Sequence, residues 1–116
     1  MPSGRRFHRR HRARNPGMSF VAEAEGSIAG CIFGGHDGRR GYLYHLAVLP
    51  HFRRLRIGKS LVARAIAAIS ADGIEKFHID VYRNNAEGLR FWQALGWHER
   101  GDLKRLSVIP AGCSNS

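Results

Sequence analysis

The chain has 116 residues, of which 43% are hydrophobic. This length and composition fit one small globular domain and exclude a fully disordered chain. The formal net charge is +10, from 19 basic and nine acidic residues. Two cysteines, Cys31 and Cys113, form neither a disulfide framework nor a metal-binding spacing. The N-terminus lacks a secretory apolar segment, and no apolar stretch reaches the roughly 20 residues that span a bilayer. These features predict a cytoplasmic protein without a membrane partner or a bound metal.

Residues 1–17 are strongly basic and contain almost nothing to bury, which predicts a disordered tail. Two interpretations remain open. The preferred one is a solvated tail, or translated sequence upstream of Met18. The other is an arm that contacts nucleic acid weakly and without sequence preference. The arginines of this tail are Arg5, Arg6, Arg9, Arg10, Arg12 and Arg14.

The folded domain is predicted over residues 18–110, with a flexible C-terminal tail at 111–116. SFVAEA and SIAGCIFGG read as two short strands around a turn at Glu25-Gly26. HDGRRG predicts a second turn. YLYHLAVL then reads as a strand, rich in aromatic and branched residues, that Pro50 ends.

A helix follows, because apolar residues recur on one stripe and Gly73 provides a C-terminal cap. The stripe consists of Ile57, Leu61, Val62, Ala65, Ile66 and Ile69. EKFHIDVY is predicted to be a strand, and NNAEGLRFWQAL a second helix with an asparagine at its start and Gly96 at its end. WHER and LKRLSVI predict one or two final short strands. This order indicates an α/β (α+β) fold with a mixed sheet packed by helices.

The junction between the strand that Pro50 ends and the first helix is rich in positive charge. A helix N-terminus presents unpaired N–H groups and partial positive charge, so it favours phosphate. Arg53, Arg54, Arg56 and Lys59 flank this one. Gly58-Lys59-Ser60 ends like a nucleoside-triphosphate P-loop, but that motif needs its first glycine at residue 53, where this chain has Arg53.

The chain resembles the GNAT (Gcn5-related) N-acetyltransferases in two blocks. The first is Arg53-Arg54-Leu55-Arg56-Ile57-Gly58, which is similar to the family signature [RQ]-x-x-G-x-[GA] at Arg53 and Gly58. The second is Asn85, followed by Trp92 and QALGW, which is similar to N-x-x-A-x-x-x-Y-x-x-x-G-F. The resemblance covers roughly residues 19–108. It implies a mostly antiparallel mixed sheet packed by two main helices, and transfer of acetyl from acetyl-coenzyme A to an amine.

The resemblance also implies a site. Strands at 42–48 and 77–82 would splay apart, and the Leu46 and Val48 backbones would bond the pantetheine arm. The Leu46 N–H would stabilise the oxyanion. An amine would attack the thioester directly, with Tyr44 or Asp80 as candidate base. The implied cofactor-binding residues are Leu46, Ala47, Val48, Arg53, Arg54, Leu55, Arg56, Ile57, Gly58, Lys59, Ser60, Asn85 and Trp92.

Three departures from the family pattern keep alternatives open. Arg56 replaces the first signature glycine, Trp92 replaces a tyrosine that protonates the leaving thiolate, and the N-terminal strand and helices that wall the acceptor side are not apparent. The chain could therefore be a truncated or degenerate member that binds coenzyme A without turnover, or a basic-tailed nucleic-acid-binding protein. The acceptor could be a small amine, a protein N-terminus or a lysine. The incomplete wall motivates the hypothesis of a homodimer.

Overall fold

The computed structural model describes residues 6–10 and 18–111. Contacts divide the chain into two compact units, Met1–Tyr82 and Arg83–Ser116. The single folded domain over 18–110 remains a prediction. Within the described residues, no helix is long and apolar enough to cross a membrane.

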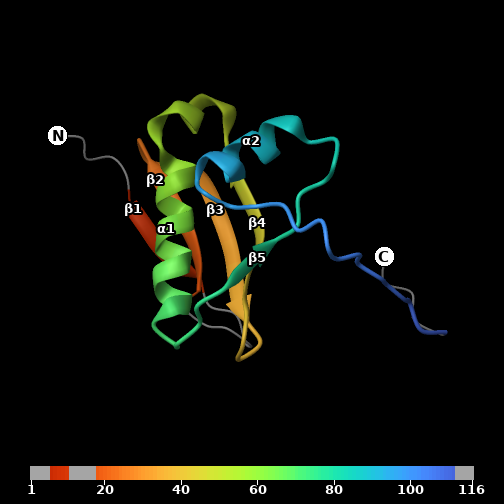
Figure 1. Cartoon of the computed structure of the whole chain (residues 1–116). Coiled ribbons are helices and arrows are strands. Elements are labelled where there is room, and N and C mark those ends of the chain that lie inside the picture. Colours follow the sequence, from red (N-terminus) through yellow and green to blue (C-terminus); the bar gives the residue numbers. More distant parts are fainter. Residues whose placement is uncertain (1–5, 11–17, 112–116) are drawn as a thin grey trace. The chain divides into compact units, whose positions relative to one another are not determined.

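The first unit is built on a five-stranded sheet whose spatial order follows the sequence (Figure 1). Its strands are β1 (Arg6–Arg10), β2 (Ser19–Ala24), β3 (Ser27–His36), β4 (Gly41–Val48) and β5 (Phe77–Ile79). The first three pairings are antiparallel, and β4 pairs with β5 in parallel. The predicted mixed, mostly antiparallel sheet is therefore confirmed.

The strand β1 corrects part of the sequence interpretation. Arg6–Arg10 pairs with β2 along its whole length, from Arg6↔Glu23 to Arg10↔Ser19. The prediction of disorder is wrong for these residues, because backbone pairing requires no apolar side chain from the added strand. The remainder of the predicted tail, and residues 112–116, lie outside the described residues.

Both turns that the sequence predicts are present. Glu25 and Gly26 join β2 to β3 with φ values of 55° and 80°. Positive φ at both central positions is typical of the two-residue turn that matches strand twist. Asp37 starts the second turn, where its N–H bonds the Arg40 carbonyl at 3.2 Å.

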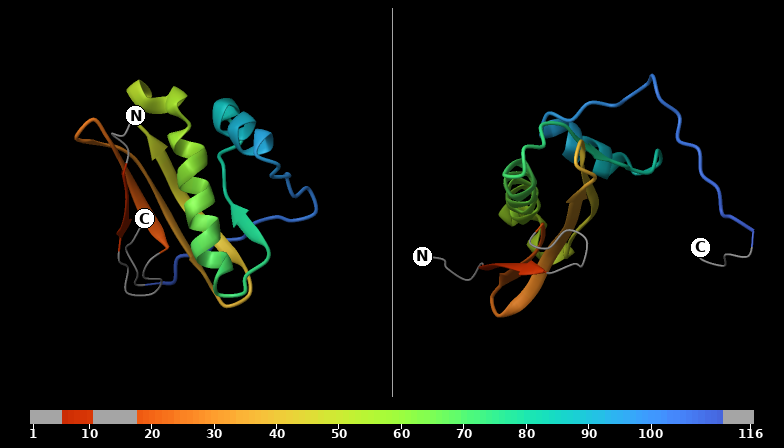
Figure 2. Two further views of the ribbon diagram at one scale, coloured as in Figure 1. Left: turned by 90° about the vertical axis from the view of Figure 1, so that its left-hand side faces the viewer. Right: turned by 90° about the horizontal axis from the view of Figure 1, so that it is seen from below.

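One helix, α1 (Ile57–Ser70), covers a single face of the sheet (Figures 1 and 2) and contacts β2, β3 and β4. Its predicted apolar stripe is confirmed: Ile57, Leu61 and Ile69 are fully buried, as are Ile32 and Leu43 on the sheet. Burying each such side chain contributes about 1.5–3 kcal/mol. Gly73 has a φ of 87° and lies beyond the last helical residue, where it bonds the Ser70 carbonyl.

The second unit contains α2 (Ala86–Ala94), which begins as predicted at an asparagine cap. The Asn85 side chain accepts a bond of 2.9 Å from the Gly88 N–H. The predicted strands in WHER and LKRLSVI are not formed in the described residues 97–111. Leu106 and Val108 are instead 92% and 82% exposed. A strand needs a neighbour to pair with, so the alternation of LKRLSVI alone does not make one.

Candidate cofactor and acceptor site

The pairing between β4 and β5 is short and stops where the resemblance implies a splay. It runs from Gly41↔Phe77 to Leu43↔Ile79, whereas β4 continues to Val48. Among the described residues, no strand pairs with β4 on this side beyond Leu43. The strand predicted over 77–82 is formed only over Phe77–Ile79, so its pairing covers one end of β4 and leaves the rest of that edge without a paired strand in the described residues.

Backbone groups of β4 point toward this free edge. The Leu49 N–H bonds the Ala29 carbonyl of β3 at 2.8 Å, so the backbone of Leu49 faces β3. Since backbone groups alternate in direction along a strand, those of Val48 and Leu46 face the opposite side. This geometry matches the expectation that these two residues offer hydrogen bonds to an extended partner.

A β-bulge interrupts β4 in the middle of this edge. The register passes from Phe33↔His45 to Gly34↔Leu43 and leaves Tyr44 as the extra residue. A bulge changes the alternation of side chains, so His45 lies on the same face as Tyr44, whereas a regular strand would place the two on opposite faces. The His45 ring stacks on Phe33 with centroids 5.6 Å apart.

After β4 the chain makes a short 3₁₀ helix, η1 (Pro50–Leu55), and then enters α1 through Arg56. Sequence reasoning did not predict η1. The Arg53 Nε donates to the Val48 carbonyl at 3.1 Å, so this arginine fastens η1 to the end of β4. Arg53 therefore has a structural contact in addition to the phosphate role that the motif implies.

Arg56 adopts the left-handed conformation, with φ 59° and ψ 22°. Glycine reaches this region without penalty, whereas other L-residues incur a cost of about 1–2 kcal/mol. The conformational demand of the signature glycine is therefore present here, although the residue is arginine. The Arg56 carbonyl accepts from the Ser60 N–H at 3.0 Å, so α1 starts normally despite the substitution.

The N-terminus of α1 has the electrostatic character that the sequence predicts. Its first turn carries no acidic residue and no side-chain cap. Ile57 and Gly58 of this turn are buried, whereas the nearby side chains of Arg53, Arg56 and Lys59 are exposed. Exposed cations beside unpaired backbone N–H groups favour an anion. The side chains of Arg54 and Leu55 lie outside what the structure describes.

The candidate bases lie where the pairing of β4 with β5 ends. Tyr44 is 64% exposed, and its ring is nearly parallel to that of Tyr42, with centroids 6.2 Å apart. Tyr42 also contacts the His78 ring of β5 at 5.7 Å. Asp80 is exposed and follows directly after β5. Tyr44 and Asp80 therefore both belong to the region where β4 and β5 separate.

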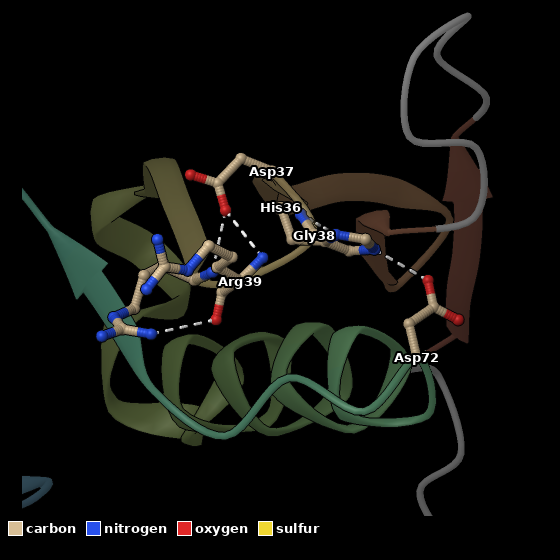
Figure 3. Close-up of polar contacts among 6 residues, drawn as sticks. His36, Asp37, Gly38, Arg39 and Asp72 are labelled. Atoms are coloured by element: carbon tan, nitrogen blue, oxygen red, sulfur yellow. Dashed lines mark hydrogen bonds and ion pairs between the residues drawn. The ribbon is translucent and has the colours of Figure 1, made fainter.

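Polar contacts that sequence reasoning missed hold the β3–β4 turn (Figure 3). Asp37 Oδ1 accepts from the N–H groups of Arg40 at 2.8 Å and Arg39 at 2.9 Å. These two backbone donors, Arg40 first, hold the pKa of the Asp37 carboxyl below its usual value. Asp37 Oδ2 lies 3.5 Å from the Tyr42 hydroxyl. The Asp-Gly turn signal was visible in the sequence, but this link to Tyr42 was not.

His36 connects the same turn to the end of α1. Its Nδ1 accepts from the Gly38 N–H at 2.9 Å, and its Nε2 lies 2.9 Å from Asp72 Oδ2 (Figure 3). Because Nδ1 is an acceptor, a neutral His36 carries its proton on Nε2 and donates it to Asp72. The turn is thus fixed by side chains from β3 and from the residues that follow α1.

The remaining predicted site residues, Asn85 and Trp92, lie in the second unit. Asn85 caps α2, and Trp92 is 6% exposed, with edge-to-face contacts to Phe91 at 5.1 Å and Trp97 at 4.9 Å. These contacts account for Trp92 as a packing residue. Their contribution to cofactor binding remains a prediction.

The mostly antiparallel sheet, its short parallel pair of β4 and β5, and the helix that follows β4 match the fold that the resemblance implies. The profile described as "Acetyltransferase (GNAT) family" matches residues 2–97. The chain therefore belongs to the GNAT acetyltransferase family. The match begins at residue 2, within the basic N-terminal segment, whereas the resemblance seen in the sequence covers roughly residues 19–108.

Individual relatives agree with this assignment. An acetyltransferase of Pectobacterium atrosepticum is 36% identical over 84% of this chain and 65% of its own length. One of Yersinia enterocolitica is 33% identical over 81% of this chain and 69% of its own. The chain thus spans about two thirds of these relatives.

Solved structures show the same fold. The aminoglycoside N-acetyltransferase AAC(6')-Iy in complex with coenzyme A superimposes with a TM-score of 0.66, 25% identity, and coverage of 82% of this chain and 66% of the other. Ard1 from Thermoplasma volcanium gives a TM-score of 0.64 at 23% identity, covering 69% of this chain and 55% of its own.

Proposed function

We propose that this protein is an acetyl-coenzyme A-dependent N-acetyltransferase. The observation that supports this most directly is the free edge of β4, where the Leu46 and Val48 backbones face away from β3 beside the basic N-terminus of α1. An extended amide-bearing chain on that edge would place its phosphates at the helix end. Acetyl-coenzyme A has both parts.

The residues of the first unit divide this binding between them. Backbone groups of Leu46 and Val48 serve the pantetheine arm, and Ala47, whose backbone faces β3, holds these two residues in position. Backbone N–H groups at the start of α1 serve the pyrophosphate, with the basic side chains as further donors. The residues in this second role are Arg53, Arg54, Leu55, Arg56, Ile57, Gly58, Lys59 and Ser60. Asn85 and Trp92 of the second unit are the proposed additional contacts.

The proposed reaction is direct attack. The uncharged amine nitrogen forms a bond to the thioester carbonyl carbon, the C–S bond breaks, and the amine loses a proton as the thiolate leaves. The Leu46 N–H stabilises the negative charge that develops on the carbonyl oxygen. Asp80 or Tyr44 accepts the proton, and Asp80 is the better candidate because a phenol is a weak base at neutral pH. Trp92 cannot protonate the thiolate, so solvent supplies that proton.

The relatives support an amine as the acceptor. AAC(6')-Iy is described as an aminoglycoside N-acetyltransferase, and its structure contains coenzyme A. The proposal for this chain is limited to an amine-bearing small molecule, a protein N-terminus or a lysine.

Calorimetric titration of acetyl-coenzyme A into the protein tests the cofactor site. Gly58→Glu places a carboxylate at the N-terminus of α1, and we expect it to abolish micromolar binding. Ala67→Glu is the matched control, because it adds the same charge at an exposed position of the same helix. Because Gly58 is buried, Lys59→Glu at an exposed site provides a second variant that should weaken binding without loss of the fold. Equal binding by all variants would contradict the proposal.

A second candidate function is a family member that binds coenzyme A without turnover. The left-handed arginine at position 56 favours it, because a side chain now stands where the family places glycine. Acetyl transfer to a panel of small amines and peptides distinguishes the two functions. Turnover that is lost with Gly58→Glu and kept with Ala67→Glu would exclude the inactive alternative.

A further inference from the structure

One face of the sheet carries a group of aromatic rings that the cofactor site does not use. It consists of Phe33, Tyr42, Tyr44, His45 and His78, which we call the aromatic surface. The rings come from β3, β4 and β5. Three ring pairs join them: Phe33 with His45, Tyr42 with Tyr44, and Tyr42 with His78, at centroid distances of 5.6, 6.2 and 5.7 Å.

These rings lie on the face opposite α1. A Cβ atom on Gly34 or Gly41 would lie 3.3 or 3.1 Å from Ile69 of α1, so these glycines face the helix. Their neighbours Phe33 and Tyr42 therefore face the other side. His78 is in register with Tyr42 and shares its face. Tyr44 also lies on this face by alternation with the buried Leu43, and the bulge at Tyr44 keeps His45, which is in register with Phe33, on the same face.

The aromatic surface coincides with the point where β4 and β5 separate. Tyr42 and His78 form one of the last residue pairs between these strands, and Tyr44 is the first residue of β4 beyond them. The backbone N–H of Leu46, the proposed oxyanion donor, follows two residues later. An acceptor that approaches the thioester from this face would pass over the tyrosine rings.

The chemistry of the aromatic surface matches a positive charge. Aromatic faces carry negative potential and attract ammonium groups. The Asp37 carboxylate adds a full negative charge, with Oδ2 3.5 Å from the Tyr42 hydroxyl. Arg39 and Arg40 lie in the same turn, but their backbone N–H groups bind Asp37 Oδ1 and leave Oδ2 directed to Tyr42.

We propose that the aromatic surface, through Tyr42 and Tyr44, binds a positively charged group of the acceptor other than its reacting amine. The reacting nitrogen must be uncharged to attack, so the charge held by the rings must belong to a second group. The acceptor class is therefore a diamine or polyamine. This inference rests on the proposed acetyltransferase function and names the substrate class for it.

Acetylation of 1,5-diaminopentane and of pentylamine provides the test, since the two differ only in the second ammonium. We expect a higher kcat/KM for the diamine with the unmodified protein. Tyr44→Leu should lower this preference about two- to five-fold, mainly through KM, because it removes the ring but keeps an apolar side chain. Tyr44→Phe keeps the ring and should keep the preference. The net charge of +10 repels cations at long range, so it cannot produce the expected preference.

Several results would overturn the inference. One is an unchanged preference in Tyr44→Leu. Another is an equal loss of the preference in Tyr44→Phe and Tyr44→Leu, which would assign the preference to the hydroxyl instead of the ring. Tyr44 is mostly exposed, so both variants should fold, and thermal melting checks this.

If acetyl-coenzyme A binds but neither these two amines nor the panel of small amines and peptides is acetylated, the proposed function fails separately. Titration of each amine into the protein saturated with coenzyme A then decides the inference, and equal affinities would refute it.

Discussion

At the scale of single residues, Arg56 is where this chain differs most informatively from its family. A left-handed residue with a Cβ atom is strained, and the strain lies between η1 and α1, beside the proposed phosphate site. We predict that Arg56→Gly raises the free energy of unfolding by up to about 1 kcal/mol, since relief of strain exceeds the entropy that glycine gains in the unfolded chain.

Arg56→Ala is the control for this prediction. Alanine removes the charge and keeps the Cβ atom, so its stability should stay close to that of the unmodified protein. Urea denaturation of the three proteins measures the difference. Equal stability of the glycine and alanine variants would show that the backbone at this position is not strained.

Asp37 gives a prediction about pH. Backbone N–H groups of Arg40 and Arg39 stabilise its ionised form, so its pKa is lower in the folded protein than in the unfolded chain. The resulting stability is complete above the unfolded pKa of about 4 and is lost as the pH falls through the folded value. Asp37→Asn keeps an oxygen acceptor for both N–H groups but does not titrate there. Urea midpoints between pH 6 and pH 2 should decline less steeply for Asp37→Asn, and parallel curves would contradict this assignment.

At the scale of elements, the position of β4 depends on the absence of a side chain at Gly30. A Cβ atom there would lie 2.7 Å from the Ala47 carbonyl oxygen, which belongs to the residue between Leu46 and Val48 of the proposed cofactor edge. We predict that Gly30→Ala destabilises the protein by about 1–3 kcal/mol and weakens acetyl-coenzyme A binding, because β4 must shift. Gly101→Ala is the control, since a Cβ atom at Gly101 meets nothing within 4 Å. Urea denaturation measures the stability, and calorimetry measures acetyl-coenzyme A binding. Equal stability and equal affinity of the Gly30→Ala and Gly101→Ala variants would contradict the prediction.

The elements also show which parts of the structure were predictable. Periodicity placed α1, the Asn85 cap placed α2, and turn residues placed the β2–β3 hairpin, because each depends on local chemistry. The sequence could not place β1 or exclude strands in LKRLSVI, because strand formation depends on a distant partner. The bulge at Tyr44 was equally hidden, since it is a property of the register between β3 and β4.

The features of the candidate site also differ in whether local sequence or a distant strand determines them. The first sequence block singled out the η1–α1 junction, and the family resemblance implied the β4 edge; both lie within the first unit. The second block, with Asn85 and Trp92, lies in the second unit. The link from Asp37 to Tyr42 and the aromatic surface required three strands in register. The pattern of YLYHLAVL alone marked its tyrosines only as strand residues.

At the scale of the whole molecule, the basic N-terminal segment has two separable properties, backbone pairing and charge. The pairing of β1 covers the edge of β2, whose residues Ser19 to Ala22 are buried. Deletion of residues 1–17 should therefore lower the free energy of unfolding by at least about 1 kcal/mol, because β2 loses backbone hydrogen bonds. Urea denaturation of the truncated chain measures this loss.

The charge of the segment is tested apart from its pairing by exchanging all six of its arginines for glutamine. Backbone pairing does not need the guanidinium groups, so this variant should keep more stability than the deletion. Binding to a single-stranded oligonucleotide, followed against salt concentration, should be weak for the unmodified protein and lost in both variants. If the glutamine variant is as unstable as the deletion, the arginine side chains rather than the β1 backbone stabilise this edge of the sheet. If the deletion costs nothing, β1 does not contribute to the stability of the sheet, and the segment is a tail as its composition first indicated.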